Sequence, residues 1–274
     1  MLQATNLYLT FNRGTPIENS ALRGLSLSIA KGEFVTVIGS NGAGKSTFLN
    51  TISGDYIPDS GRILIADVDV TRKTTAQRAA QVARVFQDPL AGTCEALTVE
   101  ENMALAMLRG KSRGLYFALK KKRRAFFREK LSTLKLGLEN RLGDRMGLLS
   151  GGQRQAVSLL IASLTQSDIL LLDEHTAALD PKAAADVLLL TNSLVEASHI
   201  TTMMVTHSMR QALDHGTRTV MLHEGRIIFD VKGTERTKLG VPDLLEMFAQ
   251  CAGSQLDDDK LLLEGFKPPA HQPG

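Results

Sequence analysis

A glycine-rich segment, "GSNGAGKST" at residues 39–47, leaves few folds open to this chain. It follows an apolar, β-branched run, "GEFVTVIG" (32–39), and precedes "KSTFLNTISG" (45–54), which reads as a helix ended by Gly54. Glycines let consecutive backbone N–H groups turn inward around phosphate oxygens, and the positive end of the helix adds to the attraction. A strand, this loop and a helix in that order predict a phosphate-binding α/β core.

The loop fits the pattern G-x-x-x-x-G-K-[ST] with Gly39, Gly44, Lys45 and Ser46. Lys45 is expected to reach the β- and γ-phosphates of a nucleotide, and the Ser46 hydroxyl to bind Mg²⁺. A plain glycine turn is the alternative, which the flanking strand and helix disfavour. The whole loop is therefore expected at the nucleotide: Gly39, Ser40, Asn41, Gly42, Ala43, Gly44, Lys45, Ser46 and Thr47.

Strands and helices alternate along most of the chain. A helix is predicted at "PKAAADVLLLTNSLVEAS" (181–198), where Pro181 suits the first turn. The alternation favours an α/β core with a largely parallel sheet. Strands are predicted at residues 32–39, 61–67, 83–87, 168–173, 200–207, 218–225 and 226–230.

One predicted strand ends in two adjacent carboxylates, at "ILLLDEH" (169–175). Like charges at neighbouring positions repel, so folding alone gives little reason for Asp173 and Glu174 to lie together. A solvated strand end is one interpretation. Beside a nucleotide, Asp173 would instead help to hold Mg²⁺, whose charge offsets the repulsion, and Glu174 would orient or deprotonate the attacking water.

A further segment, "LSGGQRQ" (149–155), places a serine and paired glycines before the helical run "AVSLLIASL". It can direct a hydroxyl, backbone N–H groups and a helix N-terminus at an anion, although alone it could be an ordinary loop. With the phosphate loop before it and "ILLLDE" after it, the order of motifs resembles that of ATP-binding cassette (ABC) ATPases. The resemblance covers residues 1 to about 233, and it implies ATP and Mg²⁺ as ligands.

The resemblance implies an α/β fold of the P-loop NTPase type. Its RecA-like core has a mostly parallel sheet, accompanied by an antiparallel β subdomain and an inserted helical subdomain. The insertion is expected at about 90–160, because no strand is evident from Thr98 to Leu136 and "TVEE" forms a capping box of Thr98 and Glu101. Residues 234–274 are expected to be a short C-terminal extension with a helix at "VPDLLEMFAQ".

The resemblance also implies roles for single residues outside the phosphate loop. Gln87, ending "ARVFQ", is similar to the family's glutamine that touches magnesium and water and faces the membrane partner. His207, ending "TTMMVTH", resembles the histidine that contacts the γ-phosphate, and Asp180, in "ALD", resembles an aspartate at the dimer seam. Each of these side chains could instead be structural. The expected catalytic residues are Glu174, His207 and Gln87, and the expected metal ligands are Ser46, Gln87 and Asp173.

Two copies of the chain are expected to join head to tail. In the family, ATP bound at the lysine of one copy meets the other copy's signature segment, which "LSGGQRQ" (149–155) resembles, so hydrolysis requires a dimer. Such closure suits twofold symmetry. The signature residues expected at the nucleotide are Ser150, Gly151, Gly152 and Gln153.

Two positions leave alternatives open. An aromatic ring upstream should stack on adenine, and Phe11 fits this role better than Tyr8, with plain core packing as the alternative. His175 follows Glu174 where many family members have proline. It either caps the strand exit, or it tunes Glu174 or the dimer seam.

Charge disfavours a nucleic-acid partner. The net charge is only +3, which does not imply a polyanion-seeking surface. The run "KKKRR" (120–124) with Phe117, Phe126 and Phe127 could suggest RNA binding. A solvated helix face, or one near anionic lipid head groups, is the better interpretation.

Cysteine and histidine positions give no sign of a metal centre. Cys94 and Cys251 match no metal-ligand spacing and indicate a reducing cytoplasm. No segment is apolar enough over a sufficient length to span a bilayer. Histidines recur at regular intervals but cross different predicted elements, so they need not converge: His199, His207, His215 and His223.

Two classes of function fit these motifs. In the first, the chain is the ATPase subunit of a membrane transporter, peripheral at the cytoplasmic face, with integral permease subunits and a substrate-binding protein as partners. In the second, it is a soluble ABC ATPase in cofactor assembly or another cytoplasmic role. Transport is favoured, since "GTCEALTVEENMALA" and "DEHTAALDP" look like bacterial importers of amino acids and similar small solutes.

Overall fold

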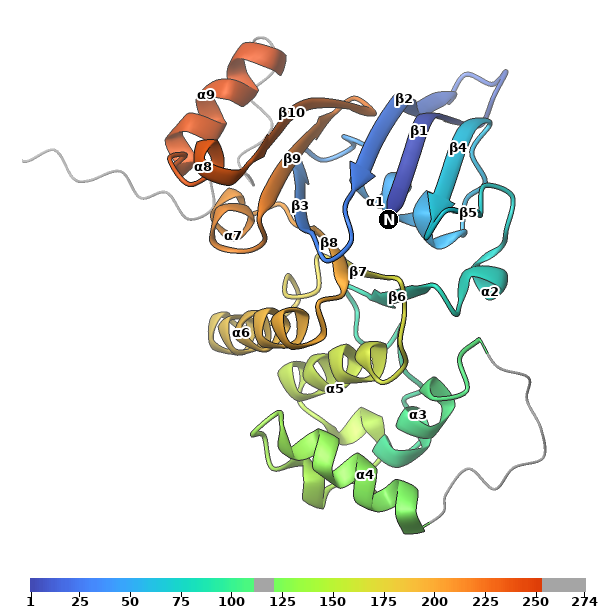
Figure 1. The fold of residues 1–274 in the computed structure, drawn as a ribbon, viewed down its shortest axis with the longest axis vertical. Helices are drawn as coiled ribbons and strands as arrows, with labels where there is room; N and C mark the ends of the chain where they lie inside the picture. The colour runs from blue at the N-terminus through green and yellow to red at the C-terminus, as the bar shows by residue number, and fades with distance from the viewer. Residues whose placement is uncertain (111–120, 253–274) are drawn as a thin grey trace, which may run out of the picture.

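The computed structural model describes residues 1–110 and 121–252 of the chain (Figure 1). The strands are β1 (Leu2–Phe11), β2 (Asn19–Ile29), β3 (Phe34–Gly39), β4 (Ser60–Ile65), β5 (Val68–Asp69), β6 (Val82–Val85), β7 (Ile169–Asp173), β8 (Thr201–Val205), β9 (Arg218–His223) and β10 (Arg226–Lys232). The helices are α1 (Lys45–Ser53), α2 (Thr75–Arg78), α3 (Val99–Ala106), α4 (Lys121–Ser132), α5 (Gly151–Ser163), α6 (Pro181–Ser198), α7 (Met209–Asp214), α8 (Gly233–Arg236) and α9 (Val241–Ala252), with the 3-10 helices η1 (Leu138–Asn140) and η2 (Met146–Leu148).

Two sheets carry the fold. The six-stranded sheet has the order β10-β9-β3-β8-β7-β6 and is parallel except for the edge strand β10. Every residue of β3 and β8 is buried, as expected for strands covered on both faces. The second sheet, β2-β1-β4-β5, is antiparallel and lies at the upper right of Figure 1. The predicted α/β fold with a mostly parallel sheet and a separate antiparallel part is therefore confirmed.

Helices α3, α4 and α5 lie together at the bottom of Figure 1. They bury a hydrophobic cluster of their own, which includes Met103, Phe127 and Val157. The predicted capping box begins α3, since the backbone N–H of Thr98 donates to Glu101 Oε2 at 2.7 Å and that of Glu101 donates to Thr98 Oγ1 at 3.3 Å. The cluster separates this helical part from the packing around the sheets.

The last described helices pack on the core. Leu244 and Phe248 of α9 are buried in a cluster with Ile38 of β3 and Met209 of α7. The helix expected at "VPDLLEMFAQ" is thus present as α9. No helix in the described residues has the length and apolar character needed to cross a membrane.

Several predicted strands are longer than the observed ones. β6 ends at Val85 and β8 at Val205, so that Gln87 and His207 lie in the loops beyond them. β4 ends at Ile65 because Ala66 and Asp67 have φ angles of 49° and 64°, which form the turn to β5. Phe11 is the last residue of β1.

Candidate functional site

The predicted phosphate loop, carboxylates, glutamine and histidine gather at one edge of the large sheet. Strands β3, β8, β7 and β6 are parallel neighbours in that order, so their carboxyl ends open on the same side. The segments at these ends contain residues 39–47, 206–207, 173–174 and 86–87, respectively. Ligands of open α/β sheets bind at this edge.

Two glycines of the phosphate loop are required by close backbone contacts. Gly39 has φ of 149°, and a side chain there would collide with the carbonyl oxygen of Leu222. Gly44, with φ of 98°, would place a Cβ atom 2.6 Å from the carbonyl oxygen of Ala21. Both glycines are buried, and only a residue without a side chain lets the backbone pass this close to Ala21 and Leu222 in these conformations.

Lys45 is the first residue of α1, and its ammonium group crosses the loop. Its Nζ donates to the carbonyl oxygen of Gly39 at 2.7 Å and to that of Ser40 at 2.9 Å. The side chain is largely buried, while Asn41, Gly42 and Ser46 of the same loop are exposed. The cation is thus held inside a concave backbone surface that is open to solvent, an arrangement that can hold phosphate groups.

Glu174 and His207 contact each other at the ends of β7 and β8. His207 Nδ1 lies 3.2 Å from Glu174 Oε2. The hydrogen bond from His207 holds the pKa of Glu174 below its usual value, against the effect of burial and with help from the charges of His207 and Lys45. Glu174 itself has a left-handed φ of 43°, an unusual conformation for a residue other than glycine. An ionised carboxylate is therefore fixed near the lysine of the phosphate loop.

The expected metal ligands also belong to this edge. β6 and β7 pair with Val85 opposite Leu172, which brings the segment of Gln87 beside Asp173. Hydroxyl, amide and carboxylate oxygens are the donors that Mg²⁺ prefers, and Mg²⁺ bound with nucleotide usually has few protein ligands and several waters. The exposed Ser46 and Gln87, with the less exposed Asp173, therefore fit this metal.

The signature residues lie in a different place from the phosphate loop. Ser150, Gly152, Gln153 and Asp180 line one pocket of about 240 Å³, and no residue of 39–47 lines it. Ser150 and Asp180 are the N-caps of α5 and α6, accepting from the backbone N–H of Gln153 at 3.3 Å and of Ala183 at 3.0 Å. Gly151, the first residue of α5, is exposed next to this pocket. One chain thus presents two separate surfaces.

Two side chains with contacts to the site segments were missed in the sequence. Gln155 of α5 is fully buried, and its Nε2 donates to the carbonyl oxygen of Phe86 at 3.0 Å, next to Gln87. Arg84 of β6 forms an ion pair with Asp173. The run "GGQRQ" contained the only sequence signal for Gln155, and no sequence pattern singled out Arg84.

The two aromatic candidates for adenine stacking differ in their surroundings. Phe11 is partly buried, and its ring meets Tyr56 edge-on with centroids 5.1 Å apart. Tyr8 is 46% exposed, with its hydroxyl beside Gly24. Stacking of Phe11 on adenine stays a prediction.

His175 is directed into the packing of α6. It is buried, and its Nε2 lies 3.0 Å from the hydroxyl oxygen of Thr191. Burial, followed by the charge of His215, lowers its pKa to about 4. The neutral imidazole is therefore part of the packed core at neutral pH.

The buried His175 makes stability depend on pH. As the pH falls below 6.5, the imidazole of His175 becomes protonated in the unfolded chain, whereas in the folded chain it stays neutral down to about pH 4. The free energy of unfolding should therefore fall over this interval. The loss from this residue is about 3 kcal/mol. Urea denaturation of the parent and of His175→Gln at pH values across this range should give a shallower slope for the variant. Equal slopes would show that His175 does not cause the dependence.

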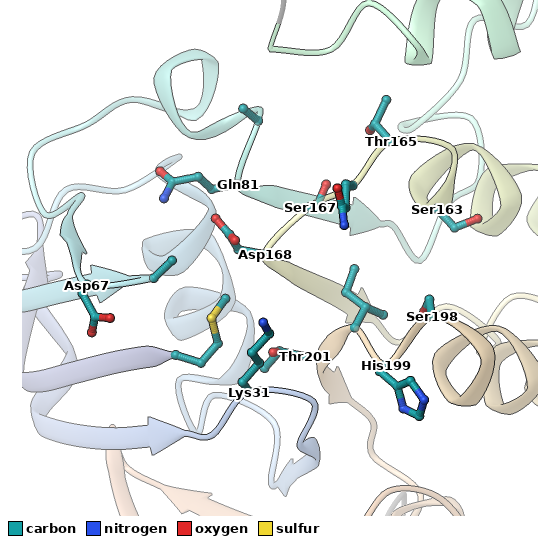
Figure 2. Close-up of a pocket in the computed structure, with 15 residues that line it drawn as sticks. Lys31, Asp67, Gln81, Ser163, Thr165, Ser167, Asp168, Ser198, His199 and Thr201 are labelled. Atoms are coloured by element: carbon teal, nitrogen blue, oxygen red, sulfur yellow. The ribbon is translucent and has the colours of Figure 1, made fainter.

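A larger cavity, of about 820 Å³, lies at the opposite edge of the sheet (Figure 2). Its lining includes Lys31, Gln81, Asp168 and Thr201, which stand at or before the amino ends of β3, β6, β7 and β8. No residue of the phosphate loop lines it, and its charged groups are mixed in sign. It is therefore distinct from the site at the carboxyl ends.

The histidines and aromatic residues set aside in the sequence have structural surroundings. His215 Nδ1 contacts the amide of Asn192, and His223 contacts the ring of Phe248. Within residues 1–110 and 121–252, no group of three or more histidine, cysteine or acidic side chains could hold a metal ion. Phe127 is buried in the helical cluster with Phe126 packed against it, while Phe117 and Lys120 lie outside the described residues.

Comparisons with known proteins show the family of this chain. The ABC transporter family model matches residues 22–177. A tyrosine transport ATP-binding protein of Clostridioides difficile (strain R20291) is 44% identical over 248 residues, which cover 90% of this chain and 98% of that protein. The thiamine import ATP-binding protein ThiQ of Escherichia coli (strain UTI89 / UPEC) is 38% identical over 77% of this chain and 85% of its own length. A dimeric ATP-binding cassette, solved in a post-hydrolysis state with ADP and phosphate, is 31% identical with a TM-score of 0.71 over 85% of this chain and 98% of its own.

Proposed function

Since this chain belongs to the ABC transporter family of ATP-binding, ATP-hydrolysing proteins, we propose that it is the ATPase subunit of an importer with separate membrane-spanning subunits. The proposal rests on one observation. The phosphate loop, His207 and Glu174 lie at the carboxyl ends of three neighbouring strands, where His207 contacts Glu174. The similarity to a transport protein over 98% of its length supports the same conclusion.

The phosphate loop would hold the triphosphate of ATP. Its backbone N–H groups and the N-terminus of α1 face the phosphates, and Lys45 exchanges its carbonyl partners for phosphate oxygens. Phe11 stacks on the adenine. Ser46, Gln87 and Asp173 would hold Mg²⁺, which offsets charge on the phosphates when it is bound.

Glu174 would accept a proton from the attacking water. The water oxygen bonds to the γ-phosphorus, while the bond from that phosphorus to the bridging oxygen breaks and its electron pair leaves with ADP. His207, already in contact with Glu174, orients the carboxylate and contacts the γ-phosphate. Gln87 positions the water from the neighbouring loop.

A second copy would complete each site. Ser150 and Asp180 are exposed at the ends of two helices, apart from the phosphate loop of their own chain. Together with Gly151, Gly152 and Gln153, they would contact a nucleotide that is bound to another molecule. In this division residues 1–233 form the ATPase domain with its helical subdomain at about 90–160, and residues 234–274 form the extension.

An amino acid is the proposed solute, with tyrosine the first to test because of the tyrosine transport relative. Thiamine is a second candidate, supported by the similarity to thiamine import subunits. A substrate-binding protein would deliver the solute to the permease subunits, and this chain would bind them at the cytoplasmic face of the membrane.

Removal of this chain from its organism is expected to abolish ATP-dependent uptake of the solute. Uptake of radiolabelled tyrosine and of thiamine would be compared in the deletion strain, with the parent chain or Glu174→Gln supplied in trans. Loss of tyrosine uptake, restored by the parent alone, is the expected result. Loss of thiamine uptake would reassign the solute, and unchanged uptake of both would contradict both assignments.

A further inference from the structure

Arg84 connects three segments of the nucleotide site. Its Nη2 lies 2.6 Å from Asp173 Oδ2, and its Nη1 lies 2.9 Å from Asp55 Oδ2. Asp55 follows α1, the helix that begins with Lys45, and Asp173 ends β7. One guanidinium therefore bridges the segment after the phosphate-loop helix and the carboxylate expected at Mg²⁺.

The guanidinium of Arg84 is itself held on several sides. Asp55 accepts hydrogen bonds from Ser53 Oγ at 2.6 Å and from Thr75 Oγ1 at 2.8 Å, which fix the carboxylate that anchors Arg84. The ring of Phe86 lies 4.5 Å from the guanidinium carbon. The side chains of Arg84 and Asp173 are only 13% and 14% exposed. Such a planar cation, fixed by two carboxylates and a ring, restricts the orientations open to Asp173.

We propose that Arg84 is a positioning residue that orients Asp173 for the divalent cation, an inference that rests on the proposed ATPase function. Arg84 holds one carboxylate oxygen of Asp173. The carboxylate is therefore already ordered before the metal binds, which lowers the entropy cost of binding. Groups that hydrogen-bond to metal-binding carboxylates commonly change metal affinity by about 10–100-fold when they are removed. A positive charge alone would have the opposite effect, because it repels the metal.

The sign of the change in metal affinity therefore tests the proposal. The dissociation constant of a non-hydrolysable ATP analogue with a β,γ-imido bridge would be measured by calorimetry in EDTA and in saturating Mg²⁺. The dissociation constant in EDTA divided by that in Mg²⁺ reports how much the metal strengthens binding. For Arg84→Gln we expect this ratio to fall by about 10-fold or more, with binding in EDTA unchanged. Arg84→Lys keeps the charge but loses the planar fork, so its ratio should fall as well.

Arg218→Gln is the matched control. Arg218 is 12% exposed and also forms two ion pairs, with Glu33 and Asp230, but it lies at the amino end of β9. Its loss should lower the thermal stability without changing the ratio.

Four outcomes would contradict either the positioning role of Arg84 or the proposed ATPase function. An unchanged or increased ratio in Arg84→Gln would overturn positioning, and so would an equal fall in Arg218→Gln. Weaker binding in EDTA would assign Arg84 to the phosphates instead. Failure of the parent to bind the analogue at all would contradict the proposed function rather than the role of Arg84.

Discussion

Replacing Glu174 with glutamine is expected to lower the ATPase rate by about 10²–10⁴-fold while ATP binding is retained. Glutamine keeps the size of the side chain and can still contact His207, which lies 3.2 Å from the carboxylate. It cannot accept the proton of the attacking water. The loss should therefore appear in turnover and leave the affinity for nucleotide largely intact.

The mass of the Glu174→Gln protein in Mg-ATP would be measured beside its ATPase rate. An ATP-stabilised dimer without turnover is the expected result, because bound ATP is no longer consumed. Glu196→Gln, at an exposed position of α6, is the matched control and should hydrolyse ATP like the parent. Undiminished turnover in Glu174→Gln would refute its catalytic assignment, and a monomer in Mg-ATP would indicate that closure needs the membrane partners.

Two inactive variants should restore each other's activity when they are mixed. Lys45→Met removes the lysine proposed to bind phosphate, and Ser150→Arg would block the proposed signature surface, so either protein alone should be inactive. In a head-to-tail dimer of the two, Lys45 of one copy and Ser150 of the other form one intact site. Random pairing makes half of the dimers mixed, so the mixture should regain up to about a quarter of the parental rate.

A second mixture provides the control for this experiment. Lys45 and Glu174 contribute to the same site from the same chain, so Lys45→Met mixed with Glu174→Gln leaves no intact site in any dimer. The ATPase rates of both mixtures would be followed against protein concentration. Recovery only in the first mixture is expected. No recovery in either would contradict a site shared between two chains.

Features set by neighbouring residues could be predicted from the sequence. The helix expected at 181–198 coincides with α6, because Pro181 and the N-cap Asp180 define its start locally. The capping box of Thr98 and Glu101 was likewise visible. The phosphate loop followed from a contiguous pattern, and its position between β3 and α1 is as predicted.

Features set by distant contacts could not be predicted. Arg84 contacts Asp173 and Asp55, and Gln155 contacts Phe86. The partners are so far apart in the sequence that helix and strand periodicity cannot predict these contacts. The surroundings of His175 depend on Thr191 of α6, and no sequence pattern predicts that these two residues lie together. The strand predicted at 61–67 was too long at its end. Ala66 and Asp67 adopt left-handed conformations in the turn, which their residue types do not predict.

The strand order has a consequence for the synthesis of this protein on the ribosome. β3, which leads into the phosphate loop, pairs only with β8 and β9, and both are translated much later. A nascent chain that ends before Thr201 has no partner strand for β3, and Ile38 completes its packing only when Leu244 and Phe248 have emerged. The ability to bind ATP therefore arises only after β8 and β9 have been translated, long after the phosphate loop itself has been made.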